Sequence, residues 1–170
     1  DGVVKLIERA IGDAGKTYQE QAMAIFTDHY NRHMLDHAAL YPGVYDLLRH
    51  FSGKRKIILT NKRYKFTEKM ASALNIADYF DEIIGADSTP YIKPDPQLIK
   101  TVLERFPVEK KKKIIIGDGV NDILLARNSG IVSWAICRSP RRKPKTTAEM
   151  PMDRVMPKVR MVATRLEAML

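Results

Sequence analysis

Two aspartates, Asp118 and Asp122, lie four residues apart in the sequence GDGVND, directly after three consecutive isoleucines. Carboxylate oxygens suit Mg²⁺, which proteins usually bind through one or two carboxylates together with waters and a substrate phosphate oxygen. Gly119 allows the backbone to turn sharply between the two aspartates. The pair therefore predicts a magnesium site. A tight turn in which Asp122 only caps the next helix is the alternative interpretation.

Polar residues also follow two other apolar runs. Thr60 and Asn61 end the sequence KIILTN, and Lys93 lies in IKPDP, after the run EIIGAD. Thr60 offers a hydroxyl to phosphate oxygens, and Lys93 offers a positive charge beside a metal-bound anion. Taken alone, the first motif is also typical of a helix cap and the second of a turn. The occurrence of all three motifs in this order favours a phosphate site over three unrelated turns.

Four short apolar segments must position these residues, and helical patterns separate them. The expected strands lie in 56–60, 80–87, 113–118 and 131–136, and the expected helices in 62–76, 94–106 and 121–130. Apolar strands that alternate with helices predict an α/β fold, a doubly wound parallel sheet with both faces covered. Such sheets bind ligands at the carboxyl ends of their strands, where all three motifs fall.

The two ends of the chain differ from this alternating region. Residues 3–11, 18–35 and 42–53 show helical spacing before the first strand. Residues 137–170 carry 9 Lys/Arg against 3 Asp/Glu, whereas residues 1–136 carry 20 against 17. A basic tail can bind nucleic acid, but no aromatic residue for base stacking accompanies it, so a solvated segment is favoured. Within the tail, only 159–170 suggests a helix.

Composition narrows the remaining function classes. No apolar run among the 170 residues is long enough to span a bilayer, and no signal-peptide pattern opens the sequence. The single cysteine, Cys137, fits a reducing, cytoplasmic setting. His29, His33 and His37 share one stripe of an expected helix, a spacing that can hold a transition metal. A solvated stripe is favoured, because a structural zinc site needs a fourth, separate ligand.

Through ILTNK, IKPDP and GDGVNDILLARNSG, the chain resembles the haloacid dehalogenase-like phosphatases, and among them the phosphoglycolate phosphatase group. The resemblance implies a Rossmann-like core beneath a helical cap, and Mg²⁺-dependent hydrolysis of a small phosphomonoester through an aspartyl-phosphate. It implies that Thr60 binds the transferring phosphoryl group, with Asn61 beside it, and that Lys93 neutralises phosphate and nucleophile. Asp118 would bind the metal, and Asp122 would help to hold the metal or its waters.

The resemblance also suggests how the chain is organised. Residues 1–40 are expected to form a partial helical cap, 41–137 the α/β core without its first strand, and 138–170 a basic, divergent tail. The family's first motif is an apolar strand that ends in Asp-x-Asp-Gly-Thr, and no Asp-x-Asp occurs in the 170 residues. The expectation is that the first strand and the nucleophile precede residue 1, which would leave a gap in the sheet with exposed strand edges and a chain inactive alone.

Three other interpretations stay open at this point. The motif GDGVND also resembles the phosphorylation domain of P-type ATPases, although the short spacing from TNK and the absence of apolar spans speak against such a fragment. A catalytically inactive binding module with the same fold is the second interpretation, and a nucleic-acid binder that uses the basic tail is the third. The expected partner is a small phosphorylated substrate, with no membrane and no nucleic acid, and the sequence does not indicate an oligomeric state.

Overall fold

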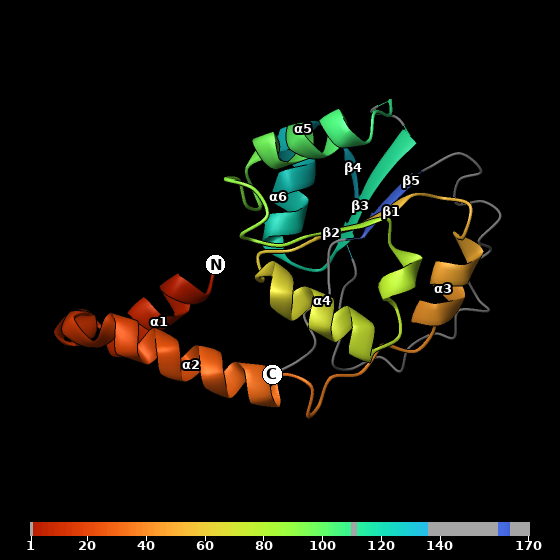
Figure 1. Ribbon diagram of the computed structural model, residues 1–170. Helices are drawn as coiled ribbons and strands as arrows, with labels where there is room; N and C mark the ends of the chain where they lie inside the picture. The colour runs from red at the N-terminus through yellow and green to blue at the C-terminus, as the bar shows by residue number, and fades with distance from the viewer. Residues whose placement is uncertain (1, 110–111, 136–159, 164–170) are drawn as a thin grey trace, which may run out of the picture.

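A five-stranded parallel sheet forms the centre of the computed structural model, which describes residues 2–109, 112–135 and 160–163 (Figure 1). The strands lie in the order β2-β1-β5-β3-β4, and every neighbouring pair is parallel. Their bounds are β1 Lys56–Leu59, β2 Glu82–Ile84, β3 Lys113–Gly117, β4 Val132–Ala135 and β5 Arg160–Ala163. The predicted α/β core with a parallel sheet is confirmed.

Helices cover both faces of the sheet. Because successive side chains of a strand point to opposite faces, Ile57 and Leu59 pack in one apolar cluster with residues of α5 and α6, whereas Ile58 packs in a second cluster with residues of α3 and α4. Ile115 and Ile114 of β3 divide between the two clusters in the same way. The helices are α3 Val44–His50, α4 Tyr64–Ala73, α5 Pro96–Arg105 and α6 Val120–Ser129, with a short 3-10 helix, η2, at Ala77–Tyr79.

The middle strand comes from the carboxyl-terminal part of the chain and corrects two expectations. Residues 160–163, expected in a helix, form β5, and the expected gap in the sheet is absent because β5 fills the place between β1 and β3. It pairs in parallel with both neighbours, for example Val162 with Ile57 and with Ile115. Pairing on both sides satisfies the backbone N–H and C=O groups of β1 and β3 that a gap in the sheet would leave exposed. The free energy gained from this pairing outweighs the local preference of residues 160–163 for a helix. The other residues expected in that helix lie outside the described part.

A helical hairpin precedes the core and lies beside α4 (Figure 1). It consists of α1 Val3–Ile11, the 3-10 helix η1 Asp13–Tyr18 and α2 Gln19–His33. The ring of Tyr30 meets that of Phe66 edge to face at 5.2 Å, and the Lys69 ammonium donates to the backbone oxygen of Asn31 at 2.7 Å. These contacts fix α2 to α4. The hairpin corresponds in position to the partial cap expected for residues 1–40, although its role as a cap stays a prediction.

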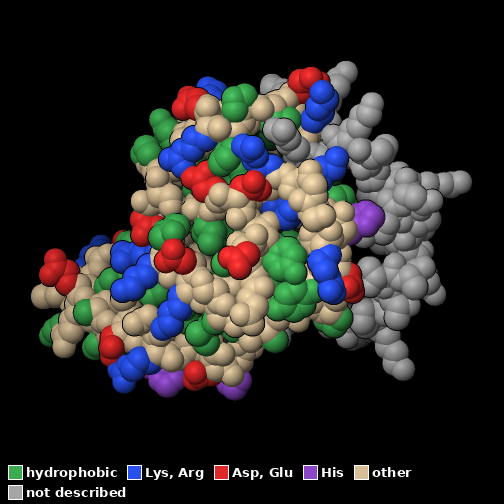
Figure 2. All heavy atoms as spheres, turned by 45° about the vertical axis from the view of Figure 1, so that its right-hand side comes forward, with side chains coloured by type: hydrophobic (Ala, Val, Ile, Leu, Met, Phe, Trp, Pro, Cys, Tyr) green, Lys and Arg blue, Asp and Glu red, His purple; other side chains and the backbone are tan. Residues whose placement is uncertain are grey.

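Charges of both signs share the surface. On the face shown in Figure 2, basic and acidic side chains are interspersed over the hairpin and the core, and no single-sign patch covers it. The basic stretch at 138–159 lies outside the described residues. Within the described part, each helix is too short or too polar to cross a bilayer.

Gly85, just after β2, lies against the backbone that leads into α4. A Cβ placed on Gly85 would lie 2.2 Å from the backbone nitrogen of Tyr64 and 2.6 Å from its Cα. We therefore expect Gly85→Ala to push the two loops apart and to lower the free energy of unfolding by about 1–3 kcal/mol in urea titrations. Gly53→Ala is the matched control, because nothing lies within 4 Å of its added Cβ. Equal midpoints for the two variants would contradict this close approach.

Candidate active site

The sheet brings the three sequence motifs to one edge. Thr60 follows β1 directly, Asp118 follows β3 directly, and Asp122 lies in the first turn of α6. Lys93 lies in the loop that joins β2 to α5. Because the strands are parallel, their carboxyl ends meet at the same edge, and the four side chains come from loops at that edge.

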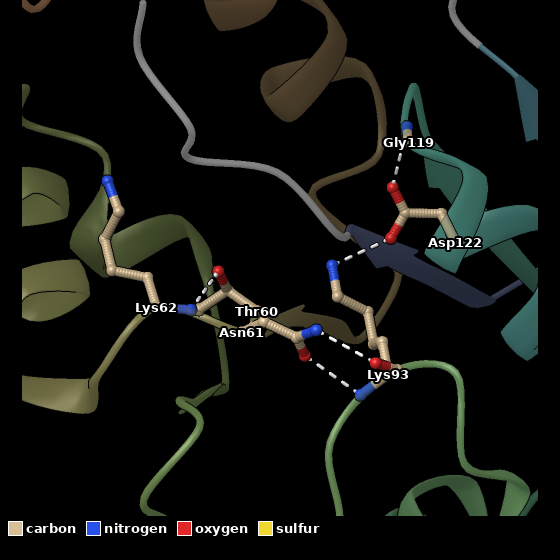
Figure 3. Close-up of polar contacts among 6 residues, drawn as sticks. All are labelled: Thr60, Asn61, Lys62, Lys93, Gly119 and Asp122. Atoms are coloured by element: carbon tan, nitrogen blue, oxygen red, sulfur yellow. Dashed lines mark hydrogen bonds and ion pairs between the residues drawn. The ribbon is translucent and has the colours of Figure 1, made fainter. Parts of the chain in front are cut away.

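Lys93 and Asp122 form a buried ion pair at this edge. The Lys93 ammonium donates to Asp122 Oδ1 at 2.8 Å, and each side chain is only 6% exposed (Figure 3). Taking two charges out of water is costly, and their attraction offsets this cost only when the geometry is good. The sequence assigned Lys93 to phosphate and Asp122 to metal; the structure adds that each holds the other in place.

The Asn61 carboxamide fixes the backbone of Lys93. Its nitrogen donates to the Lys93 carbonyl oxygen at 2.9 Å, and its oxygen accepts from the Lys93 N–H, also at 2.9 Å (Figure 3). These two bonds tie the end of β1 to the loop before α5, so they set where the Lys93 side chain begins. Sequence reasoning placed Asn61 beside the phosphate and missed this contact, which joins residues 32 positions apart. Its substrate-binding role stays a prediction.

Thr60 is nearly buried at the end of β1, with 4% of its surface exposed. Its N–H donates to the carbonyl of Ile84 at 3.0 Å, which continues the pairing of β1 with β2. Its hydroxyl oxygen accepts from the Lys62 N–H at 3.1 Å (Figure 3). A hydroxyl that accepts a hydrogen bond keeps its own O–H as a donor. Thr60 can therefore offer that donor to an anion at the sheet edge.

Asp118 and Asp122 are the two carboxylates that a magnesium ion could use at this edge. Asp118 Oδ1 is shut off from solvent at the end of β3. Asp122 already accepts from Lys93 through Oδ1 and from the Gly119 N–H through Oδ2, at 3.1 Å. In the part of the chain that the structure describes, no group of three or more His, Cys, Asp or Glu could hold a metal. The donor set suits a Mg²⁺ ion that takes one or two carboxylates from these loops and completes its shell with waters and substrate oxygens.

The histidine stripe does not form such a group either. The rings of His29 and His33 lie 4.4 Å apart between centroids, and His33 Nδ1 lies 2.8 Å from Asp36 Oδ2. His29 and His33 lie on α2, and His37 lies in the segment between α2 and α3, so none of the three lies in the loops that carry the sequence motifs.

The first turn of α4 begins four residues after Thr60, and a residue that follows β2 holds it in place. Asp87 Oδ1 accepts from the Tyr64 N–H at 2.7 Å, and so caps the helix across the loop pair. The Tyr64 hydroxyl donates to Glu68 Oε1 at 2.7 Å, and this hydrogen bond raises the pKa of Tyr64 above its ordinary value. The phenol therefore stays neutral at physiological pH.

The matched region of the chain decides its family. Residues 5–136 match the sequence model of the haloacid dehalogenase-like hydrolases. The chain belongs to that family. This confirms the resemblance that the three motifs suggested, and the match covers the hairpin except its first two residues, together with strands β1 to β4.

Named relatives within the family are phosphoglycolate phosphatases. That of Vibrio vulnificus strain YJ016 is 36% identical over 120 residues, which are 68% of this chain and 52% of the relative. That of Chromobacterium violaceum is 30% identical over 144 residues, which are 80% of this chain and 64% of the relative. The chain thus spans between about half and two thirds of the length of these curated relatives. They support the phosphoglycolate phosphatase group within the family.

Solved structures agree with the fold. A protein from Haemophilus somnus described as a predicted phosphoglycolate phosphatase superposes with a TM-score of 0.66 at 27% identity, over 69% of this chain and 53% of that one. A haloacid dehalogenase-like hydrolase from Bacteroides fragilis gives a TM-score of 0.68 over 96% of this chain and 76% of that one, and at 20% identity it supports the fold alone.

Asn61 is expected to position Lys93 in this family member. We expect Asn61→Ala to lose both bonds to the Lys93 backbone, to speed hydrogen exchange at the Lys93 amide, and to cost about 1–3 kcal/mol of stability. Asn128→Ala is the control, because the hydrogen bond that the Asn128 side chain makes to a described residue is exposed; it runs at 3.2 Å to the Pro94 carbonyl in the same loop as Lys93. Unchanged protection of the Lys93 amide in Asn61→Ala, measured by NMR, would refute the positioning role.

Proposed function

We propose that this chain supplies the phosphoryl- and metal-binding groups of a Mg²⁺-dependent phosphomonoesterase of the phosphoglycolate phosphatase type. The observation that carries the proposal is the buried Lys93–Asp122 pair, held by Asn61 at the sheet edge where Asp118 follows β3. A buried ammonium in a fixed place suits recognition of a small anion. The family membership and the names of the relatives support the same reaction class.

The charges at the sheet edge support a requirement for a divalent cation. Lys93 is one cation against the two carboxylates of Asp118 and Asp122, so these three groups alone repel a phosphate dianion. A divalent cation at Asp118 reverses that balance and makes the edge attractive to phosphate. Magnesium also polarises a phosphoryl oxygen when it is bound. We therefore expect phosphate to bind only when the cation is present.

In the proposed reaction, the residues of this chain bind and orient the phosphoryl group. The Thr60 hydroxyl donates to one of its oxygens, and the Lys93 ammonium neutralises charge on it. Asp122 and Asn61 hold Lys93 in place, and Asp118 is the carboxylate that would ligate the metal. Catalysis of this kind depends on positioning and charge stabilisation.

An attacking carboxylate completes the proposed mechanism. We infer that it belongs to an Asp-x-Asp segment outside these 170 residues, in which no such pair occurs. Its oxygen would form a bond to phosphorus as the bond to the alcohol oxygen breaks, and the second aspartate of the pair would give that oxygen its proton. The product is an aspartyl-phosphate, an acyl phosphate from which water would then release phosphate. The cytoplasmic location stays a prediction.

The decisive experiment assays the gene product that contains this chain. We expect release of phosphate from 2-phosphoglycolate and p-nitrophenyl phosphate with Mg²⁺, none with EDTA, and a loss of roughly a hundredfold or more in kcat for Thr60→Val, as when one donor to a transition-state oxyanion is removed. Turnover that survives EDTA, or that Thr60→Val leaves intact, would defeat the proposal.

A catalytically inactive binding module is the second candidate, favoured by the absence of Asp-x-Asp from the sequence. It predicts that the same gene product binds phosphate with Mg²⁺ but releases none from any ester. Turnover of either ester excludes it.

A further inference from the structure

An open cleft of ≈ 1110 Å³ lies between the helical hairpin and the start of α4. One wall comes from α1, η1 and α2, and includes Lys16, Glu20 and Asp28. The other wall comes from the residues that follow Thr60 and includes Arg63 and Lys65. The contacts between α2 and α4 bridge the two walls, so the hairpin and the core hold the cleft between them.

Some charged side chains that line the cleft form ion pairs or hydrogen bonds with described residues, and others do not. Lys16 pairs with Asp13 at 2.8 Å, Asp28 pairs with Arg32, and Asp87 accepts from the Tyr64 N–H. Glu20 lies on the hairpin wall. On the core wall, the Arg63 and Lys65 side chains make no ion pair or hydrogen bond with any residue that the structure describes. Both are exposed and line the cleft, so the core wall presents two cations beside the single carboxylate of Asp87.

The core wall of the cleft is connected to the proposed phosphoryl site by a short segment of chain, although Thr60, Lys93 and Asp118 do not line the cleft themselves. Arg63 follows Thr60 by three residues, and three residues of extended chain span at most about 11 Å. Gly85 and Asp87 pack against the same short segment, so the backbone that carries Arg63 is held at a fixed distance from Thr60. A guanidinium there matches the planar, bidentate geometry of a carboxylate or a phosphate.

We propose that Arg63, with Lys65 beside it, forms a second anion subsite that selects phosphate monoesters carrying another negative group on the alcohol part. This rests on the proposed function, because Thr60, Lys93 and Asp118 must hold the phosphoryl group itself. The selected class therefore contains esters with a carboxylate or a second phosphate a few bonds from phosphorus, and esters with a neutral tail gain nothing from the subsite.

Three ligands of similar length test the proposal by calorimetry on the 170-residue chain with Mg²⁺. They are ethyl phosphate with a neutral tail, 2-phosphoglycolate with a carboxylate, and ethylene glycol bisphosphate with a second phosphate. We expect Arg63→Gln to raise the Kd of 2-phosphoglycolate and of ethylene glycol bisphosphate roughly tenfold, as for the loss of one charged hydrogen bond. The Kd of ethyl phosphate is expected to stay unchanged. The ligand that loses more identifies the preferred second anion.

Two matched variants separate a local subsite from overall charge. Arg127→Gln and Lys100→Gln each remove one exposed cation outside the cleft lining, on α6 and α5. Both are expected to leave all three Kd values unchanged. An equal loss for ethyl phosphate and 2-phosphoglycolate in Arg63→Gln, or no loss for either, would overturn the subsite. Failure of the proposed function gives a different result, because the unmodified chain then fails to bind even ethyl phosphate.

Discussion

Lys93→Met is expected to lower the free energy of unfolding by about 3–5 kcal/mol, because it leaves the Asp122 carboxylate buried and without its cation. Both side chains of the pair are 6% exposed, so water reaches the remaining carboxylate poorly. Methionine keeps most of the length of the lysine side chain but has neither its charge nor its hydrogen-bond donors. Urea unfolding monitored by circular dichroism measures the loss.

The double variant Lys93→Met/Asp122→Leu separates the charge from the packing. Replacing both members by apolar groups removes the unpaired charge, so we expect much of the stability to return. Lys100→Met, on the exposed side of α5, is the control and is expected to change stability by less than about 0.5 kcal/mol. A single variant as stable as this control would mean that the ion pair contributes nothing to the fold.

Asp118→Asn is expected to weaken Mg²⁺ binding by at least about a hundredfold, more than the loss usual for a residue that only supports a metal ligand. The physical reason is the loss of an anionic oxygen directly after β3, while both carboxylate oxygens of Asp122, four residues further on, accept hydrogen bonds from other groups. Titration of the chain with Mg²⁺ in a calorimeter gives the affinity directly.

Asp78→Asn is the charge-matched control for that titration, since Asp78 is exposed on η2. It is expected to bind Mg²⁺ as the unmodified chain does. If Asp118→Asn retains the affinity of this control, the metal lies elsewhere and the assignment of Asp118 is wrong.

The helices and strands of the core were predictable because their buried segments have recognisably apolar sequences. Strand β1 is buried at every position, and its sequence KIIL is apolar in three of four places. Gly130, with φ 63°, ends α6 where the helical pattern stops. Each such segment carries its own signal, and the alternation of strand and helix then dictates the parallel sheet and the edge at which its loops gather.

Long-range pairings were not predictable in the same way. The residues of β5 were expected in a helix. A four-residue strand whose partners are distant in the sequence has no local sequence pattern of its own, and β5 forms only by pairing with β1 and β3. The bonds of Asn61 to Lys93 and the pairing of Lys93 with Asp122 likewise join residues about 30 positions apart. The motifs indicated which residues to inspect, and only the fold showed which of them hold one another.

The central claim is that Thr60, Lys93 and Asp118 act on a single magnesium-bound phosphate. A crystal structure of the chain with Mg²⁺ and inorganic phosphate measures this most directly. The account predicts one phosphate ion about 3 Å from both Thr60 Oγ1 and Lys93 Nζ, with the metal between that ion and the Asp118 carboxylate. A phosphate bound away from these groups, or a metal that does not contact Asp118, would contradict it.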